Sequence, residues 1–239
     1  MYDYLFPITN ILFVLLVVGI IFAIIYGLRI AHQNIGTKKN RSETLIQYVL
    51  LGILFWLATI GVLAHLGFFA NFDALPPRVL VAVIPPVILT IILLRSKEFS
   101  LILANIPRSW LVYVQSFRIV MEIILWMGML ANFVPFQMTF TGFNYDIIVG
   151  ITAILGGMVF FRKGRLRRFE AIIWNIFGIL LLLFIVGIAA VSAPGPMQIF
   201  TNEPANRMIA FVPFIWLPGF VVPFALAVHL FSLKQLLRK

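Results

Sequence analysis

Seven long apolar segments dominate this 239-residue chain and restrict what it can fold into. They cover approximately residues 8–30, 45–70, 79–94, 110–133, 145–161, 171–191 and 209–233. Runs of roughly 20 apolar residues are long enough to cross the hydrocarbon core of a bilayer as α-helices. They do not show the alternating pattern of a membrane β-barrel. The predicted fold class is therefore all-α, a polytopic membrane bundle of seven transmembrane helices in which residues 1–239 form a single domain.

The composition excludes a soluble domain of this length. Hydrophobic residues make up 62% of the chain, charged residues 11%, and the mean hydropathy is +1.08. The chain has no cysteine, which excludes a disulfide, a thiolate nucleophile and a Cys-ligated metal. No lysine or arginine precedes the first apolar segment, unlike in a secretory signal, so we expect this segment to be a retained first span.

The basic residues are distributed unevenly between the two sides of the expected bundle. Arg78 and Arg207 fall on one side, Arg118 lies within a span, and the other fifteen of the 18 fall on the opposite side. Those fifteen are Arg29, Lys38, Lys39, Arg41, Arg95, Lys97, Arg108, Arg162, Lys163, Arg165, Arg167, Arg168, Lys234, Arg238 and Lys239. By the positive-inside rule, the amino terminus is predicted outside and the carboxyl terminus in the cytoplasm. The basic face is expected to attract anionic lipid headgroups, and nothing in the pattern indicates nucleic-acid binding.

Arg118 and Glu122 stand out because they are ionisable residues inside the fourth apolar segment. An ionised side chain near the bilayer centre costs about 2.5–3.5 kcal/mol on insertion scales. The two lie four residues apart, on one stripe of a helix with Gln115. Asn144 and Asp146 open the next span, where either could cap the helix. Arg118 is predicted to pair either with Glu122, as a fastener within one helix, or with Asp146 across two helices, as part of a ligand-binding pocket.

Two further groups of residues carry structural predictions. Asn175 and His229 lie near the cytoplasmic ends of the sixth and seventh spans and are expected to lock these helices together or to form a secondary polar site. Prolines interrupt the third and seventh spans and are expected to kink or unwind them, which would let these spans gate the pocket. The prolines are Pro85, Pro86, Pro213, Pro218 and Pro223.

The positions of the histidines and of Lys234 argue against several known kinds of zinc, haem and retinal site. His32, His65 and His229 are expected at different depths, so they cannot share one zinc ion or haem iron, which leaves open only a haem held by one histidine and an unidentified second ligand. Lys234 lies beyond the seventh apolar segment, where it cannot form a retinal Schiff base. The chain also lacks Walker, HExxH and GxSxG motifs. We therefore predict no cofactor, no metal and no assigned catalytic residue.

Several stretches together resemble a family of uncharacterised bacterial multi-pass inner-membrane proteins. They lie at residues 110–122, 138–150, 174–175, 192–196 and 216–232, so the resemblance runs roughly from Pro107 to the end. It implies a location in the bacterial inner membrane and carries no activity. Thr141 and Phe143 depart from the more polar residues expected there, which implies a less polar outer rim for any pocket.

Three functions are compatible with these features. The first is binding or transport of a small or lipophilic molecule in a pocket bounded by Gln115, Arg118, Glu122, Asn144 and Asp146, whose carboxyl groups would allow proton coupling. The second is a non-catalytic membrane accessory or assembly subunit whose polar residues only hold helices together. The third is an enzyme acting on a lipid or quinone, with Glu122 or Asp146 as acid or base. Assembly into a homo-oligomer is also compatible with the sequence.

Overall fold

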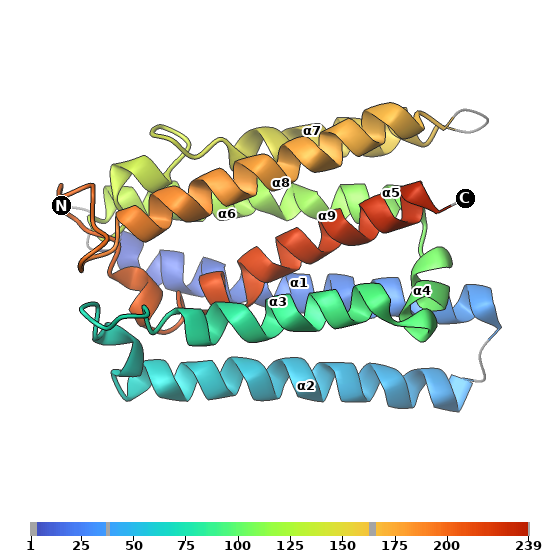
Figure 1. The fold of residues 1–239 in the computed structure, drawn as a ribbon, viewed down its shortest axis with the longest axis horizontal. Coiled ribbons are helices and arrows are strands. Elements are labelled where there is room, and N and C mark those ends of the chain that lie inside the picture. The colour runs from blue at the N-terminus through green and yellow to red at the C-terminus, as the bar shows by residue number, and fades with distance from the viewer. Residues whose placement is uncertain (1–3, 37–38, 163–165, 239) are drawn as a thin grey trace.

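The computed structural model describes residues 4–36, 39–162 and 166–238, and every regular element in them is helical (Figure 1). This confirms the all-α prediction. The α-helices are α1 (Leu5–Ile35), α2 (Lys39–His65), α3 (Leu80–Arg95), α4 (Lys97–Ala104), α5 (Arg108–Tyr113), α6 (Phe117–Leu130), α7 (Asp146–Phe160), α8 (Arg168–Val191) and α9 (Val222–Leu237). Short 3₁₀ turns cover Phe68–Ala70, Val114–Ser116, Phe136–Met138 and Met208–Ala210, and a π-helical turn covers Leu217–Val221.

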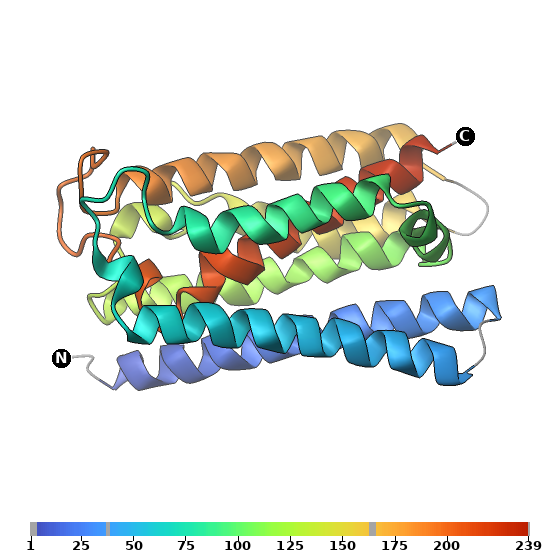
Figure 2. The same ribbon diagram turned by 60° about the horizontal axis from the view of Figure 1, so that its bottom comes forward.

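The long helices lie side by side along one axis and alternate in direction (Figure 1). The connections after α1, α3, α4 and α7 lie at the same end as the carboxyl terminus, and those after α2, α6 and α8 lie at the opposite end with the amino terminus. Helices α1 and α2 run together along one edge (Figure 2). Of the basic residues predicted on the cytoplasmic side, Lys38, Lys163, Arg165 and Lys239 lie outside the described residues.

In the described part of the chain, five helical segments are long and apolar enough to cross a membrane. They are Leu5–Ile35, Glu43–His65, Arg108–Leu130, Arg168–Val191 and Leu217–Leu237. The α3–α4 pair gives a sixth if counted as one broken span, and α7 is a shorter apolar helix of 15 residues. The structure thus supports five or six candidate spans and not clearly the seven predicted, because the third and fifth segments form helices of only 16 and 15 residues.

Large apolar side chains cover the outside of the bundle. Phe22, Phe55, Leu155 and Leu180 each expose more than half of their surface. Inside, α1 packs on α6 and on the segment before α9, where Phe13 stacks on Phe214 with ring centroids 4.9 Å apart. A contiguous apolar exterior of this extent is unusual for a soluble monomer.

The prolines of α3 do not break it. The helix continues from Leu80 to Arg95 through Pro85 and Pro86, and the sharp bend of 81° comes after it, between α3 and α4. The expectation that these two prolines unwind the helix is therefore wrong.

The prediction for the last span is confirmed, since the chain is a π-helical turn around Pro218 before α9 begins at Val222. Pro223 lies in the first turn of α9 and cannot donate to the Gly219 carbonyl, four residues earlier. The indole N–H of Trp56, on α2, donates to that carbonyl at 2.9 Å instead. The unwound backbone is thus held by a neighbouring helix.

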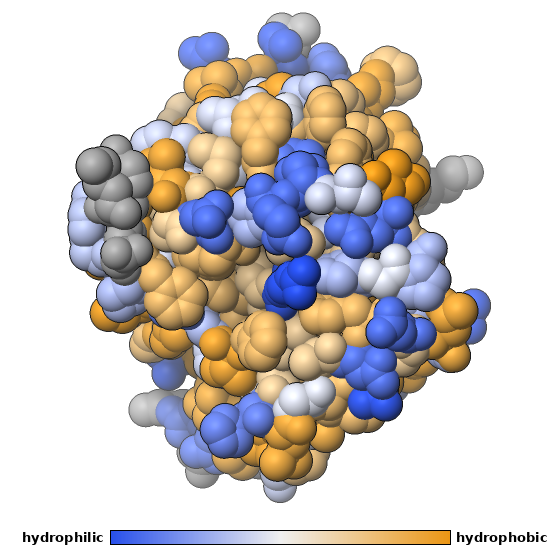
Figure 3. Space-filling view, turned by 90° about the vertical axis from the view of Figure 1, so that its left-hand side faces the viewer, coloured by the Kyte–Doolittle hydropathy of each residue, from blue (hydrophilic) through white to orange (hydrophobic). Residues whose placement is uncertain are grey.

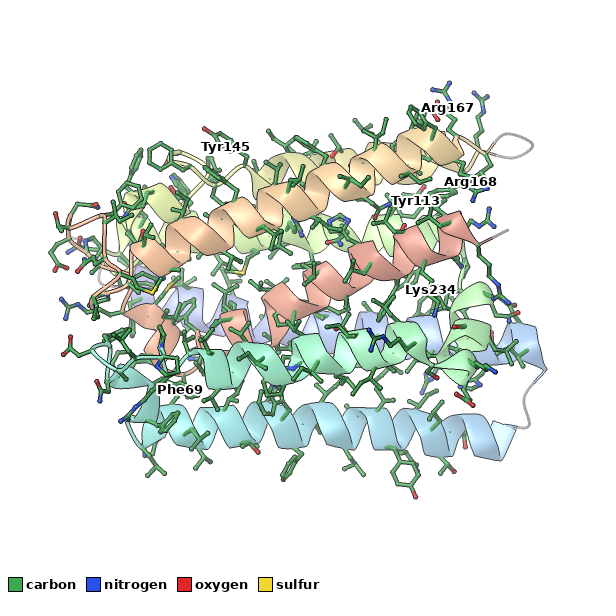
Figure 4. All side chains as sticks on the ribbon, in the orientation of Figure 1. Phe69, Tyr113, Tyr145, Arg167, Arg168 and Lys234 are labelled. Atoms are coloured by element: carbon green, nitrogen blue, oxygen red, sulfur yellow. The ribbon has the colours of Figure 1, made fainter. Side chains whose placement is uncertain are left out.

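The end of α9 holds the unexpected helix α4 in place. Ser96 caps α4 by accepting from the Phe99 N–H at 3.1 Å. Lys234 reaches the Leu94 carbonyl and the Ser100 hydroxyl (Figure 4). The neighbouring Gln235 amide donates to the carbonyls of Leu103, at 2.7 Å, and Ile106, at 2.6 Å. These bonds give side-chain donors to carbonyls at the bend between α3 and α5, where the helical hydrogen-bond pattern is interrupted.

Replacing Gln235 with leucine is expected to loosen this bend. The change removes the side-chain donor of the Ile106 carbonyl, while the Leu103 carbonyl still accepts from the Ile106 N–H, and it should lower the free energy of unfolding by about 1–3 kcal/mol. Hydrogen exchange in detergent should speed up in residues 97–107 and remain unchanged in α8. Gln47→Leu, at an exposed position on α2, is the matched control. Equal exchange in the two variants would contradict the role given to Gln235.

Candidate functional site

The candidate site is built around Arg118 on α6. The buried face of this helix includes Arg118, Met121, Glu122 and Leu125, spaced by three and four residues, so both charged side chains turn toward the bundle interior. Arg118 and Glu122 each expose only 2% of their surface. Counting from the ends of the α5–α6 segment, Arg118 lies roughly 15 Å from Arg108 and 18 Å from Leu130 by helical rise, near the middle of the bundle.

Arg118 pairs across two helices. Its Nη1 lies 2.9 Å from Oδ1 of Asp146, the first residue of α7, and both side chains are buried. Its Nε donates to Gln115 Oε1 at 3.2 Å, and the Gln115 amide donates to the Ala225 carbonyl of α9 at 2.9 Å. Of the two pairings that the sequence left open, the structure has Arg118 with Asp146. The guanidinium is thus tied to α7 and, through Gln115, to α9.

Glu122 is held by Asn144. The Asn144 amide donates to Glu122 Oε1 at 2.6 Å and to the Met138 carbonyl at 3.1 Å, and its Oδ1 accepts from the Asp146 N–H at 3.1 Å. Asn144 therefore positions the Glu122 carboxyl group and caps the start of α7 at once. The sequence indicated a capping role for Asn144, but it gave no sign of the bond to Glu122.

Irregular backbone reaches the middle of the bundle at this point. Helix α6 ends at Leu130, and α7 begins beside Arg118, so the segment between them must return to that depth before the helix starts. Figure 1 shows α7 lying beside only part of the length of α8. Within a membrane, non-helical backbone is tolerated only where protein or a cavity covers it. The positive end of the α7 dipole thus lies among the polar groups.

A cavity of about 220 Å³ lies against this polar group. Arg118, Glu122, Asn144 and Asp146 line one part of it, and Gln115 lies behind Arg118 and does not line it. Most of the remaining wall is apolar, from α3, α6, α8 and the segment 217–225, including Pro218. The structure therefore brings four of the five predicted ligand-binding residues to one cavity, together with one of the five prolines.

Two polar atoms of this cluster have no hydrogen-bond partner among the described residues. They are Nη2 of Arg118 and Oε2 of Glu122. Buried polar atoms in proteins are nearly always paired. Because Arg118 and Glu122 both line the cavity, a polar group of a molecule that occupies it can supply the missing partners after a small movement of these side chains.

A second cavity, of about 230 Å³, lies at the loop end of the bundle. It shares Val79, Leu80, Ala190 and Ile209 with the first cavity and is lined further by residues of the connections 69–78 and 193–197. Figure 3 looks onto this end, where hydrophilic side chains lie across the middle of the face among hydrophobic ones. Arg78 lines the second cavity and donates to the Phe68 carbonyl at 3.1 Å.

Comparison with known proteins identifies the family. Residues 76–237 match a domain of unknown function, DUF8737. The chain belongs to this family. No curated protein and no solved structure matches it. The DUF8737 region includes every residue lining the cavity beside Arg118, whereas α1 and α2 precede it. The family match thus begins some thirty residues before the stretch where the sequence resemblance started, and it includes α3.

A separate polar cluster joins α8 to α9 within the DUF8737 region. His229 Nδ1 lies 2.9 Å from Asn175 Oδ1, and the Asn175 amide donates to the Ser232 hydroxyl at 3.0 Å and to the Ala171 carbonyl at 2.8 Å. The predicted contact between Asn175 and His229 is therefore present, while Ser232 was not assigned a role from the sequence. A Cβ on Gly178 would lie 2.4 Å from the His229 ring, so this glycine makes room for the imidazole.

Asn175→Ala is expected to destabilise the α8–α9 contact. It removes the partner of both His229 and Ser232 in a fully buried position, and leaving such groups unpaired costs about 1–3 kcal/mol. Thermal unfolding in detergent would measure the change. The double variant Asn175→Ala with Ser232→Ala should lose less than the sum of the two single changes, because the two residues share one hydrogen bond. Additive losses would contradict this coupling.

Proposed function

We propose that this DUF8737 protein is an integral membrane protein that binds or transports a small amphiphilic molecule. The observation that carries the proposal is the largely apolar cavity with one polar wall, where Arg118 Nη2 and Glu122 Oε2 lack partners among the described residues. Ligand sites in proteins are typically concave and apolar, with few polar groups that orient the ligand. Ionisable residues inside a membrane bundle are rare and mark functional sites.

The proposed topology has seven passes. Five are the long helices, the sixth is α3 with the bend into α4, and the seventh is α7 with the irregular segment that precedes it. The proposed orientation places the amino terminus outside and the carboxyl terminus in the cytoplasm, as the distribution of basic residues indicates. The proposed location is the bacterial inner membrane, on the strength of the sequence resemblance. The irregular segment before α7 and the π-helical turn before α9 resemble the discontinuous helices found in transporters.

A binding test uses the purified protein in lipid nanodiscs. Native mass spectrometry should detect a small amphiphile bound to the wild-type protein after extraction from membranes. Glu122→Gln should reduce its occupancy, because the amide offers a donor where the wild type offers an acceptor. Glu203→Gln, on an exposed loop glutamate, should leave it unchanged.

Other results of the same experiment would favour the alternative functions. A folded wild type without any bound molecule, indistinguishable from Glu122→Gln, would favour the accessory or assembly subunit. A chemically altered lipid or quinone that forms only with the wild type would favour the enzyme, with Glu122 as acid or base.

A further inference from the structure

The cavity beside Arg118 is open along one side, between α3 and α8. Val186 of α8 lines the cavity and still exposes 38% of its surface, and Leu80 of α3 lines it and exposes 36%. Ile185, next to Val186, also lines the cavity but is buried. The lining therefore continues from the buried polar group to the outer surface. Helix α9 packs against both α3 and α8, and its residues Val222 and Ala225 line the cavity between them.

The size of the cavity limits what it encloses. A cavity of about 150 Å³ holds one benzene molecule. At about 220 Å³, this cavity has room for a polar group with a ring or a short chain. A longer apolar molecule bound here must extend through the opening between α3 and α8, along a surface of exposed apolar side chains such as Ile84.

The two unpaired atoms, Arg118 Nη2 and Glu122 Oε2, limit which polar end group a bound molecule can have. Arg118 Nη2 can only donate, and the Glu122 carboxyl group accepts when ionised. A hydroxyl group both donates and accepts, so it can bond to both atoms. A carboxylate would meet the carboxyl groups of Glu122 and Asp146, and an ammonium group would meet the guanidinium of Arg118.

We propose that the ligand is a single-chain amphiphile with a hydroxyl end group, and that it reaches the cavity sideways from the hydrocarbon layer through the opening between α3 and α8. This inference rests on the proposed function. The hydroxyl group lies between Arg118 and Glu122, and the tail leaves between Leu80 and Val186. The second cavity, at the loop end, is not the route.

The route is tested with tritiated 1-dodecanol and the full-length protein in nanodiscs, by a scintillation proximity assay. Val186→Trp fills the opening and should weaken binding at least about tenfold. Gly187→Trp is the matched control, because a Cβ at that position meets no atom within 4 Å. Ala193→Trp fills only the loop-end cavity and should change binding less than about twofold. If Val186→Trp unfolds at a lower temperature, Val83→Trp tests the same cavity from α3, because Val83 lines it and does not line the loop-end cavity.

Weak binding in Ala193→Trp with normal binding in Val186→Trp would overturn the proposed route.

The end group is tested by competition with dodecyl methyl ether, which cannot donate a hydrogen bond, and with dodecylamine. Both should compete at least about tenfold less well than unlabelled dodecanol. If either competes equally, and Glu122→Gln still abolishes binding, the hydroxyl class is wrong while the proposed function stands. If the wild type binds none of the three probes and retains no other molecule, the proposed function fails as well.

Discussion

Replacing Arg118 with methionine is expected to lower the free energy of unfolding by about 3–5 kcal/mol, the usual cost of removing one partner from a buried ion pair. The change leaves the Asp146 carboxylate buried without its counter-charge, and it frees Gln115 Oε1 from its donor. Equilibrium unfolding in mixed detergent micelles would measure the loss. Methionine keeps much of the length and apolar volume of the side chain, so a cavity contributes little to the effect.

Two further variants separate the ion pair from the site. Arg118→Met combined with Asp146→Leu should regain most of the lost stability, because a buried pair replaced by apolar residues of similar volume is often neutral. The same double variant should not bind the amphiphile, since the donor at Nη2 is gone. Arg207→Met is the control, because its pair with Glu203 is exposed and worth at most about 1 kcal/mol. A double variant that regained both stability and binding would show that Arg118 is only a fastener.

The positions of the apolar helices could be predicted from the sequence because length and hydropathy are properties of single segments. The bends and irregular segments between these helices could not be predicted from the sequence. The prolines at positions 85 and 86 predicted a break that α3 does not have, whereas the 81° bend after Arg95 depends on bonds from Lys234 and Gln235, more than 130 residues away. A bend that is stabilised by distant side chains leaves little trace in its own sequence.

For the candidate site, the sequence likewise indicated which residues lie near one another, but not how they pair. Helical spacing placed Arg118, Glu122 and Gln115 on one face, and chain order placed Asp146 on the next helix. The choice between Glu122 and Asp146 as the partner of Arg118 depends on Asn144, which binds Glu122 Oε1. That bond exists because the irregular segment before α7 returns to the middle of the bundle, and no periodic pattern marks such a segment. Sequence reasoning therefore identified the residues, and the structure was needed for their pairing.

The close approach of α6 and α7 is what brings Arg118 to Asp146, and Gly150 permits it. A Cβ at Gly150 would lie 2.8 Å from Ile119 Cγ1 and 2.9 Å from the Ile119 backbone nitrogen. The side chain of Ile119 can move, but its backbone moves only if the helices separate. Gly150→Val is therefore expected to lower the free energy of unfolding by about 3 kcal/mol, at the upper end of the range for overpacked positions. Thermal and detergent-induced unfolding would both report it.

The same substitution should also impair binding, although it changes no charged residue. Gly150 lies one helical turn from Asp146, and Ile119 directly follows Arg118, so separating the helices lengthens the distance between the carboxylate and the guanidinium. Ile119→Ala should rescue Gly150→Val only in part, since it relieves the contact with Cγ1 and leaves the contact with the backbone nitrogen. Gly187→Val, where a new Cβ meets nothing within 4 Å, is the matched control. If Gly150→Val bound dodecanol as tightly as this control, the distance between α6 and α7 would not set the geometry of the site.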